Sequence, residues 1–360
     1  MDRSNNIFTY LKWRGDLLIK DNPFNEIDAL ILCEMVYVRF DGIVPGPGEE
    51  GGITIAEAAQ KYEISKEKNI LWYAEKEELF LELARSPRFA EMTMSNYIST
   101  TDVRQQQQFA AMHIQVAPNL TFIAFRGTDD TIVGWREDFN MSHMMPVPSQ
   151  QSAVEYINQT AKNLFQKYWL GGHSKGGNLA IYSAMFCQPK LQKKIVKINS
   201  FDGPGFNRKV VHEDSYLAIK EKISAYVPVA SIVGMMMEHE EDYKVVESSG
   251  FSILQHEGLN WNVCGPNFVL AEDVGKFSRH FSITMKSWLS KVPPEERRDF
   301  VNTVFDILEE SNIITLADFK EMDVKKTGEL LKAASKLPHE QRDLMKKLIK
   351  LLIEEGTKRN

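Results

Sequence analysis

A serine set between glycines is the feature of this sequence best suited to covalent chemistry. Gly172, Ser174 and Gly176 form a G-x-S-x-G pattern, which follows a short apolar run and precedes a predicted helix. A serine on such a sharp turn projects its hydroxyl above the sheet, and the glycines leave room for the strained backbone. The N–H of Lys175, at the start of the helix, would stabilise an oxyanion. Ser174 is therefore the predicted nucleophile of an acyl-transfer reaction.

The same glycines could instead cradle a phosphate. A Walker A loop requires G-K-[ST] in that order, whereas this sequence reads Ser174-Lys175 and its glycines are spaced differently. The order of these two residues therefore favours the nucleophile over the phosphate-binding loop.

A second motif lies upstream of the serine. Residues 125–128 read Phe-Arg-Gly-Thr at the end of a predicted strand, and Trp135 and Asp138 follow. Together with residues 172–177, this motif resembles the class 3 lipases, the fungal triacylglycerol lipase type of the α/β-hydrolases, and most of all a bacterial branch of that superfamily. The resemblance covers residues 107–265.

The resemblance implies an oxyanion hole and a lid. By its position Thr128 supplies one oxyanion donor, and Lys175 supplies the other through its backbone N–H. Residues 131–149 correspond to the lid of class 3 lipases and include Trp135 and three methionines. Because methionine serves both cores and adaptable surfaces, these side chains would either line a lid or simply pack.

The general base is expected late in the chain, because α/β-hydrolases present serine, acid and histidine in that order. Four histidines lie between the serine and the C-terminal tail: His212, His239, His256 and His280. His256 follows an apolar run, as a residue on the loop after a strand would, and its position matches the late histidine of the family. It is the predicted base, whereas His173 is expected to point beneath the nucleophile turn.

The acid of the triad is harder to assign. In class 3 lipases it follows the strand that corresponds to residues 223–229, but residues 229–233 contain no carboxylate. Asp202 follows the preceding strand, where pancreatic-type lipases carry their acid, and it is the predicted partner of the histidine. An Asp-Gly pair also favours turns, so a purely structural role stays open for Asp202. Glu238 and Asp242 are the alternative acids.

The pattern along the chain predicts an α/β-hydrolase fold with a mostly parallel central sheet. Predicted strands at residues 107–116, 120–126, 168–170, 195–201, 223–229 and 243–247 alternate with helices in the part of the chain that carries the serine. We expect a hydrolase domain over residues 1–290, with an N-terminal helical segment over 1–90. A C-terminal helical domain is expected over residues 291–360, where the apolar residues recur at helical spacing.

Composition sets the remaining expectations. The formal net charge of −6 gives no general attraction for nucleic acid. Cys33, Cys187 and Cys264 are widely spaced, so we expect three buried thiols in a reducing compartment rather than disulfides or a zinc site. With no signal peptide or membrane-spanning run recognised, the expected compartment is the cytoplasm.

These observations predict a serine hydrolase that cleaves carboxylic esters with an apolar acyl group, through an acyl-enzyme intermediate. The chemistry requires no metal and no cofactor, and the expected partner is a small or lipid-like ester. Two alternatives stay open: an amidase or thioesterase that uses the same triad, and a non-catalytic binding module on a hydrolase fold. The oligomeric state and the partner of the C-terminal helices are not determined by these motifs.

Overall fold

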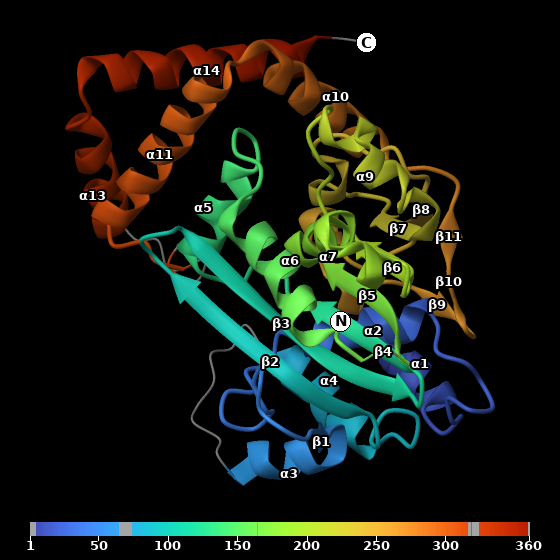
Figure 1. Ribbon diagram of the computed structural model, residues 1–360. Coiled ribbons are helices and arrows are strands. Elements are labelled where there is room, and N and C mark those ends of the chain that lie inside the picture. The colour runs from blue at the N-terminus through green and yellow to red at the C-terminus, as the bar shows by residue number, and fades with distance from the viewer. Residues whose placement is uncertain (1–4, 65–73, 164, 316–317, 319–323, 359–360) are drawn as a thin grey trace.

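One large sheet organises the chain in the computed structural model, which describes residues 5–64, 74–163, 165–315, 318 and 324–358 (Figure 1). Nine strands lie in the order β1-β2-β3-β4-β5-β6-β7-β8-β11. Their bounds are β1 Ile53–Thr54, β2 Thr93–Asp102, β3 Gln107–Ala117, β4 Leu120–Phe125, β5 Lys167–His173, β6 Ile195–Phe201, β7 Ile223–Pro228, β8 Tyr243–Val246 and β11 Leu270–Ala271. A separate hairpin joins β9 (Val263–Cys264) to β10 (Asn267–Phe268).

The sheet is mixed, which corrects the prediction of a mostly parallel one. Strands β4 to β8 run parallel to one another, whereas β1 to β4 pair antiparallel, as do β8 and β11. The antiparallel part arises because β2, β3 and β4 are joined by short connections, which cannot link parallel neighbours. The six predicted strands are confirmed, but the long strand β2 and the two-residue strands β1, β9, β10 and β11 were not predicted.

Helices cover both faces of the sheet. The helices before the nucleophile turn are α1 (Ile7–Arg14), α2 (Glu26–Met35), α3 (Ile55–Ile64), α4 (Ala74–Arg85), α5 (Ile132–Asn140) and α6 (Pro148–Thr160). After it come α7 (Lys175–Phe186), α8 (Pro189–Gln192), α9 (Asp214–Leu217), α10 (Lys276–Lys291), α11 (Pro294–Glu310), α13 (Val324–Ser335) and α14 (His339–Thr357). Short 3₁₀ turns include η4 (Val233–Met235), η5 (Ser252–His256) and η6 (Gly258–Asn260).

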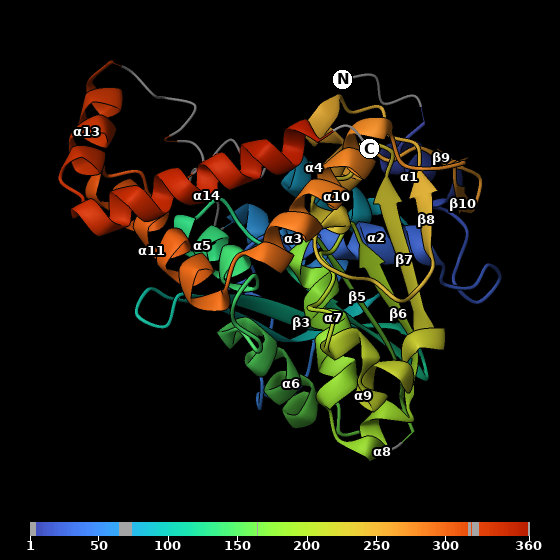
Figure 2. The ribbon, with the colours of Figure 1, turned by 90° about the horizontal axis from the view of Figure 1, so that it is seen from above.

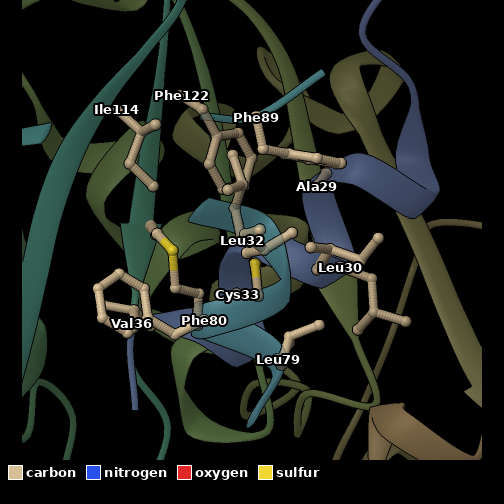
Figure 3. Close-up of a cluster of buried hydrophobic side chains, with 14 of the residues drawn as sticks. Ala29, Leu30, Leu32, Cys33, Val36, Leu79, Phe80, Phe89, Ile114 and Phe122 are labelled. Atoms are coloured by element: carbon tan, nitrogen blue, oxygen red, sulfur yellow. The ribbon is translucent and has the colours of Figure 1, made fainter. Parts of the chain in front are cut away.

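The helices form two layers, and successive side chains along the buried strands point alternately toward one layer and the other. Ile114 and Phe122 face α2 and α4, whereas Ile123 and Phe125 pack with α6 and α7 on the other face. Figure 3 shows the first of these clusters, in which Cys33 and other α2 side chains lie among residues from α4, β3 and β4. Both faces of β3 and β4 are therefore buried, which explains why these strands read as nearly continuous apolar runs.

The N-terminal helical segment supplies the first of these layers. Asn25 caps α2, accepting hydrogen bonds from the N–H groups of Ile27 and Asp28, while the Asp28 carboxylate accepts one from the N–H of Asn25. The predicted segment spans residues 1–90, of which residues 1–4 and 65–73 lie outside the described part of the chain.

The C-terminal helices pack on one another and on α5 (Figures 1 and 2). Helix α14 lies along α10 and α11, and α11 also contacts α13 and α5. Because α10 begins at Lys276, the run of helices starts before residue 291. The division of the chain into two domains stays a prediction.

Candidate functional site

Ser174 occupies a strained turn between β5 and α7. Its φ of 56° and ψ of −134° are unusual for a residue with a Cβ. Neighbouring backbone leaves no room for side chains at the flanking glycines, since a Cβ at Gly172 would lie 2.7 Å from the Cα of Gly176. Ser174 is partly exposed and directly precedes α7, at the positive end of the helix dipole. This is the strand-turn-helix context that the G-x-S-x-G pattern requires.

Asp202 and His256 form a hydrogen-bonded pair. The imidazole Nδ1 of His256 lies 2.6 Å from Oδ2 of Asp202, which follows β6 and is fully buried. Burial acts to lower the pKa of His256, but the hydrogen bond and charge of Asp202 outweigh it and hold this pKa above its usual value. A donated Nδ1–H leaves Nε2 as the basic nitrogen.

Residues 229–233 lack a carboxylate, but this segment and Gly234 donate hydrogen bonds to the carboxylate of Asp202, which follows the neighbouring strand. Ser231 Oγ donates a hydrogen bond to Oδ1 of Asp202 at 2.5 Å, and the N–H of Gly234 donates another at 3.0 Å. Asp202 itself has a φ of 49°, and its N–H donates to the carbonyl of Tyr226 on β7. The carboxylate is therefore held by its own strand end and by residues 231–234.

Thr128 follows a glycine that packs against Ser174. A Cβ on Gly127 would come within 3.0 Å of the Ser174 Cβ, so the chain before Thr128 passes directly against the nucleophile turn. The Thr128 hydroxyl donates to Oδ2 of Asp138 at 2.5 Å. Burial raises the pKa of Asp138 to about 6, although Lys175 and the hydrogen bond from Thr128 act to lower it. The chain directly before Thr128 is thus adjacent to Ser174.

The side chain of Lys175 has a role that the motif analysis missed. Its ammonium group is completely buried and lies 3.0 Å from the carboxylate of Glu137, which is also completely buried. It also donates to the backbone carbonyl of Gln108 at 2.9 Å and lies 3.8 Å from Asp138. The residue whose N–H would serve the oxyanion hole is therefore tied through its side chain to α5 and β3.

The alternative acids and bases lie elsewhere. Glu238 forms an ion pair with Lys286 at 3.0 Å, and Asp242 is exposed. His239 lies 3.0 Å from the Glu241 carboxylate. His212 is largely exposed, and Nε2 of His280 lies 2.7 Å from the carbonyl oxygen of Gly356. Among the described residues, Asp202 is the carboxylate that contacts His256.

Part of the predicted lid segment packs beneath the C-terminal helices. Ile132 is buried with residues of α11, and Phe139 stacks edge-on against Phe305. Arg136 forms ion pairs with Asp306 and with Glu309, each at 3.1 Å. The described structure therefore holds α5 against α11, which lies far from it in the sequence.

The methionines and cysteines divide between core and surface. Met141 is buried and packs with Val147 and Met237, whereas Met144 is substantially exposed and Met145 partly buried. Packing thus accounts for two of the three methionines, because Met145 also packs against buried clusters. Cys33 and Cys187 are buried as predicted, but Cys264 is exposed, because it ends a two-strand edge hairpin outside the main sheet.

The described residues hold neither a metal-ligand cluster nor a helix that could cross a membrane. Within the described residues, no group of three or more His, Cys, Asp or Glu side chains is arranged to hold a metal ion. None of the helices that the structure describes combines the length and apolar character needed to cross a bilayer.

The mixed sheet, the strained strand-to-helix turn at Ser174 and the carboxylate–imidazole pair fit an α/β-hydrolase-like fold. The Ser174 N–H donates to the carbonyl of Phe201, directly before Asp202, and the His256 ring lies 4.6 Å from the ring of His173, directly before Ser174. The chain belongs to the Mbeg1-like family, whose model matches residues 83–306. No curated protein matches it.

Solved structures of lipases resemble parts of the chain at low identity. The M37 lipase is 17% identical, with 59% of this chain and 70% of that chain covered and a TM-score of 0.36. The lipase of Rhizomucor miehei, in its propeptide complex, is 15% identical, with 48% and 71% covered and a TM-score of 0.34. The lipase of Rhizopus microsporus var. chinensis is 16% identical, with 59% and 75% covered and a TM-score of 0.31.

Proposed function

We propose that this protein is a serine hydrolase that cleaves carboxylic esters with an apolar acyl group through an acyl-enzyme at Ser174. The observation that carries the proposal is the 2.6 Å hydrogen bond between Asp202 and His256, which prepares an imidazole for base catalysis. The strained serine turn supplies a nucleophile at the end of the same parallel strands.

In the proposed first step, the Ser174 oxygen attacks the carbonyl carbon of the ester. His256 accepts the hydroxyl proton at Nε2 and then donates it to the departing alcohol oxygen as the carbon–oxygen bond breaks. Water repeats the sequence on the acyl-enzyme and releases the free acid. Asp202 keeps the imidazole in the tautomer whose Nε2 can accept a proton, and it stabilises the imidazolium that forms.

Two backbone N–H groups are the proposed oxyanion donors. Lys175 is the first residue of α7, where a helix has N–H groups without intrahelical partners. Thr128 follows Gly127, whose backbone packs against the serine turn. Each donor of this kind contributes roughly 10²–10³ in rate, because it strengthens only as negative charge develops on the carbonyl oxygen.

The preference for an ester with an apolar acyl group rests on the resemblance to class 3 lipases and on the apolar residues of segment 131–149. Met144 and Met145 lie on that segment and remain at least partly accessible. Amide and thioester bonds are alternative substrates for the same residues, since the attack and the oxyanion are identical. We further propose that the protein works in the cytoplasm.

A fluorophosphonate probe tests the proposal directly. The parent protein should be labelled covalently, and Ser174→Ala should not be labelled while it keeps its circular dichroism spectrum. Ser183→Ala is a matched control, because that serine is buried in α7 and hydrogen-bonds within its own helix. A folded parent protein that stays unlabelled would support the non-catalytic binding module instead. Comparison of ester, thioester and amide substrates with the same acyl group then ranks the three bonds.

A further inference from the structure

A buried lysine joins three parts of the chain, one of which is the loop that carries His256. Lys76 of α4 donates hydrogen bonds to the carboxylate of Glu34 on α2 and, at 3.0 Å, to that of Glu257. Its side chain is 9% exposed and Glu34 is fully buried, whereas Glu257 is 38% exposed. Glu257 directly follows His256, so this ammonium group binds the loop that carries the imidazole.

Glu34 needs this cation, because an unpaired carboxylate in the interior is costly. It lies within the apolar helix α2, and its Oε1 has no hydrogen-bond partner. The loop packs closely on it, since a Cβ at Gly258 would come within 3.1 Å of the Glu34 carboxyl carbon. A loop residue bulkier than glycine at this position would push the chain after His256 away from α2.

His173 lies between the same carboxylate and the backbone of His256, with its Nδ1 3.7 Å from Oε1 of Glu34. Its Nε2 lies 2.7 Å from the carbonyl oxygen of His256, and its Nδ1 lies 3.3 Å from the Tyr37 hydroxyl. Burial lowers the pKa of His173 despite the nearby charge of Glu34, so the ring is neutral at pH 7 and donates through Nε2. The two imidazole rings are 4.6 Å apart.

We propose that Lys76 is a positioning residue for His256: its ammonium group, held between Glu34 and Glu257, fixes the loop that follows the imidazole. The inference rests on the proposed role of His256 as general base. Lys76 acts at a distance, since it contacts the two carboxylates and not the reacting atoms. Without the ammonium group, two like charges would share one site and the loop would move.

The same arrangement sets the electrostatic surroundings of His256. The charged and titratable groups that act on it are Asp202 after β6, Asp138 on α5, Glu34 on α2, His173 on β5 and Glu257 on its own loop. Both glutamates favour the protonated imidazole. Removal of the Glu257 charge should therefore lower the pKa of His256.

Histidine-selective NMR tests this inference without relying on activity. The eight histidines are labelled at Cε1, the His256 signal is assigned with His256→Asn, and its pKa is measured by titration. In Glu257→Gln we expect a downward shift on the order of half a pH unit. In Lys76→Met we expect the low-field signal of the imidazole Nδ1 proton to move or vanish, because the loop no longer holds the ring against Asp202. Lys347→Met, which removes the exposed ion pair with Glu296, should change neither signal.

Labelling rates with the fluorophosphonate probe are measured on the same variants. We expect Lys76→Met to lower the maximal rate at least tenfold. An unchanged Nδ1 signal in folded Lys76→Met would overturn the inference, and so would an unchanged Nδ1 signal in Glu257→Gln, in which the ammonium group loses its charged partner on the loop. If Lys76→Met does not fold, the Glu257→Gln variant still decides the question, because Glu257 is half-buried and its replacement is better tolerated. The parent protein could also fail to react with the fluorophosphonate probe while the variants show the expected NMR changes. That outcome would uphold the positioning role of Lys76 and reject the proposed hydrolase.

Discussion

Replacement of Lys175 by methionine should destabilise the protein strongly. The substitution keeps the backbone N–H and most of the side-chain volume but removes the cation that pairs with Glu137. Both side chains are completely buried, so solvent does not screen the lost interaction. Breaking such a pair by removing one partner costs about 3–5 kcal/mol. Glu137 retains hydrogen bonds from the N–H groups of Gln108 and Ser149, which places the expected loss near the lower end, at about 3 kcal/mol.

The assay is equilibrium unfolding in urea, followed by tryptophan fluorescence. With a slope of about 3 kcal/mol/M, the midpoint of Lys175→Met should fall by about 1 M. The double variant Lys175→Met/Glu137→Gln removes both charges and should recover most of this loss, because a buried pair replaced as a whole is often neutral. Lys197→Met, whose pair with Glu26 is partly exposed, is the matched control and should lose about 1 kcal/mol or less.

A loss below about 1 kcal/mol in Lys175→Met would refute this reasoning, since a buried carboxylate would then tolerate the absence of its cation. Failure of the double variant to recover would also refute it. In that case the cost would come from lost packing and not from the uncompensated charge.

Three further predictions concern the site. Asp202→Asn should fold like the parent protein yet hydrolyse a chromogenic ester on the order of 10⁴-fold more slowly, because the imidazole loses its correct tautomer. Turnover near the parent value would exclude Asp202 as the acid. Gly172→Ala should fail to yield folded protein by circular dichroism, since its Cβ would meet the backbone of Gly176. The rate of fluorophosphonate labelling should fall as the pH decreases, because only the neutral ring of His256 accepts a proton. The midpoint should lie above 6.5, the ordinary pKa of histidine, because Asp202 and nearby carboxylates raise the pKa of His256. A midpoint below 6.5 would contradict that electrostatic account.

Local patterns were sufficient to predict the strands and the nucleophile turn. The buried strands β3 to β7 read as apolar runs, and the glycines around Ser174 mark a backbone that no larger residue fits. By contrast, β2 escaped prediction, because its residues alternate weakly and include the irregular positive-φ residue Asn96.

The supporting charges could not be predicted, because no local pattern links them. Glu34, Lys76 and Glu257 come from three distant stretches of the chain. The residues around each of them do not indicate that the three side chains meet. Glu137 looks like a surface residue beside Asp138 until the fold places it against Lys175. A carboxylate within the apolar run of α2 was the available signal, since a buried charge requires a partner.

The position of the acid shows how a fold constrains chemistry without dictating sequence. The imidazole needs a carboxylate at the end of a strand near the nucleophile, and β6 and β7 end side by side. Either strand can therefore supply it, provided that the other supports the buried charge. Here Asp202 follows β6, and Ser231 and Gly234 after β7 donate the hydrogen bonds that such a charge requires. The missing carboxylate in residues 229–233 thus argues against a triad only if one strand is considered alone. With both strands in view, Asp202 after β6 is the carboxylate that contacts His256, and residues 231–234 after β7 supply two hydrogen bonds to it.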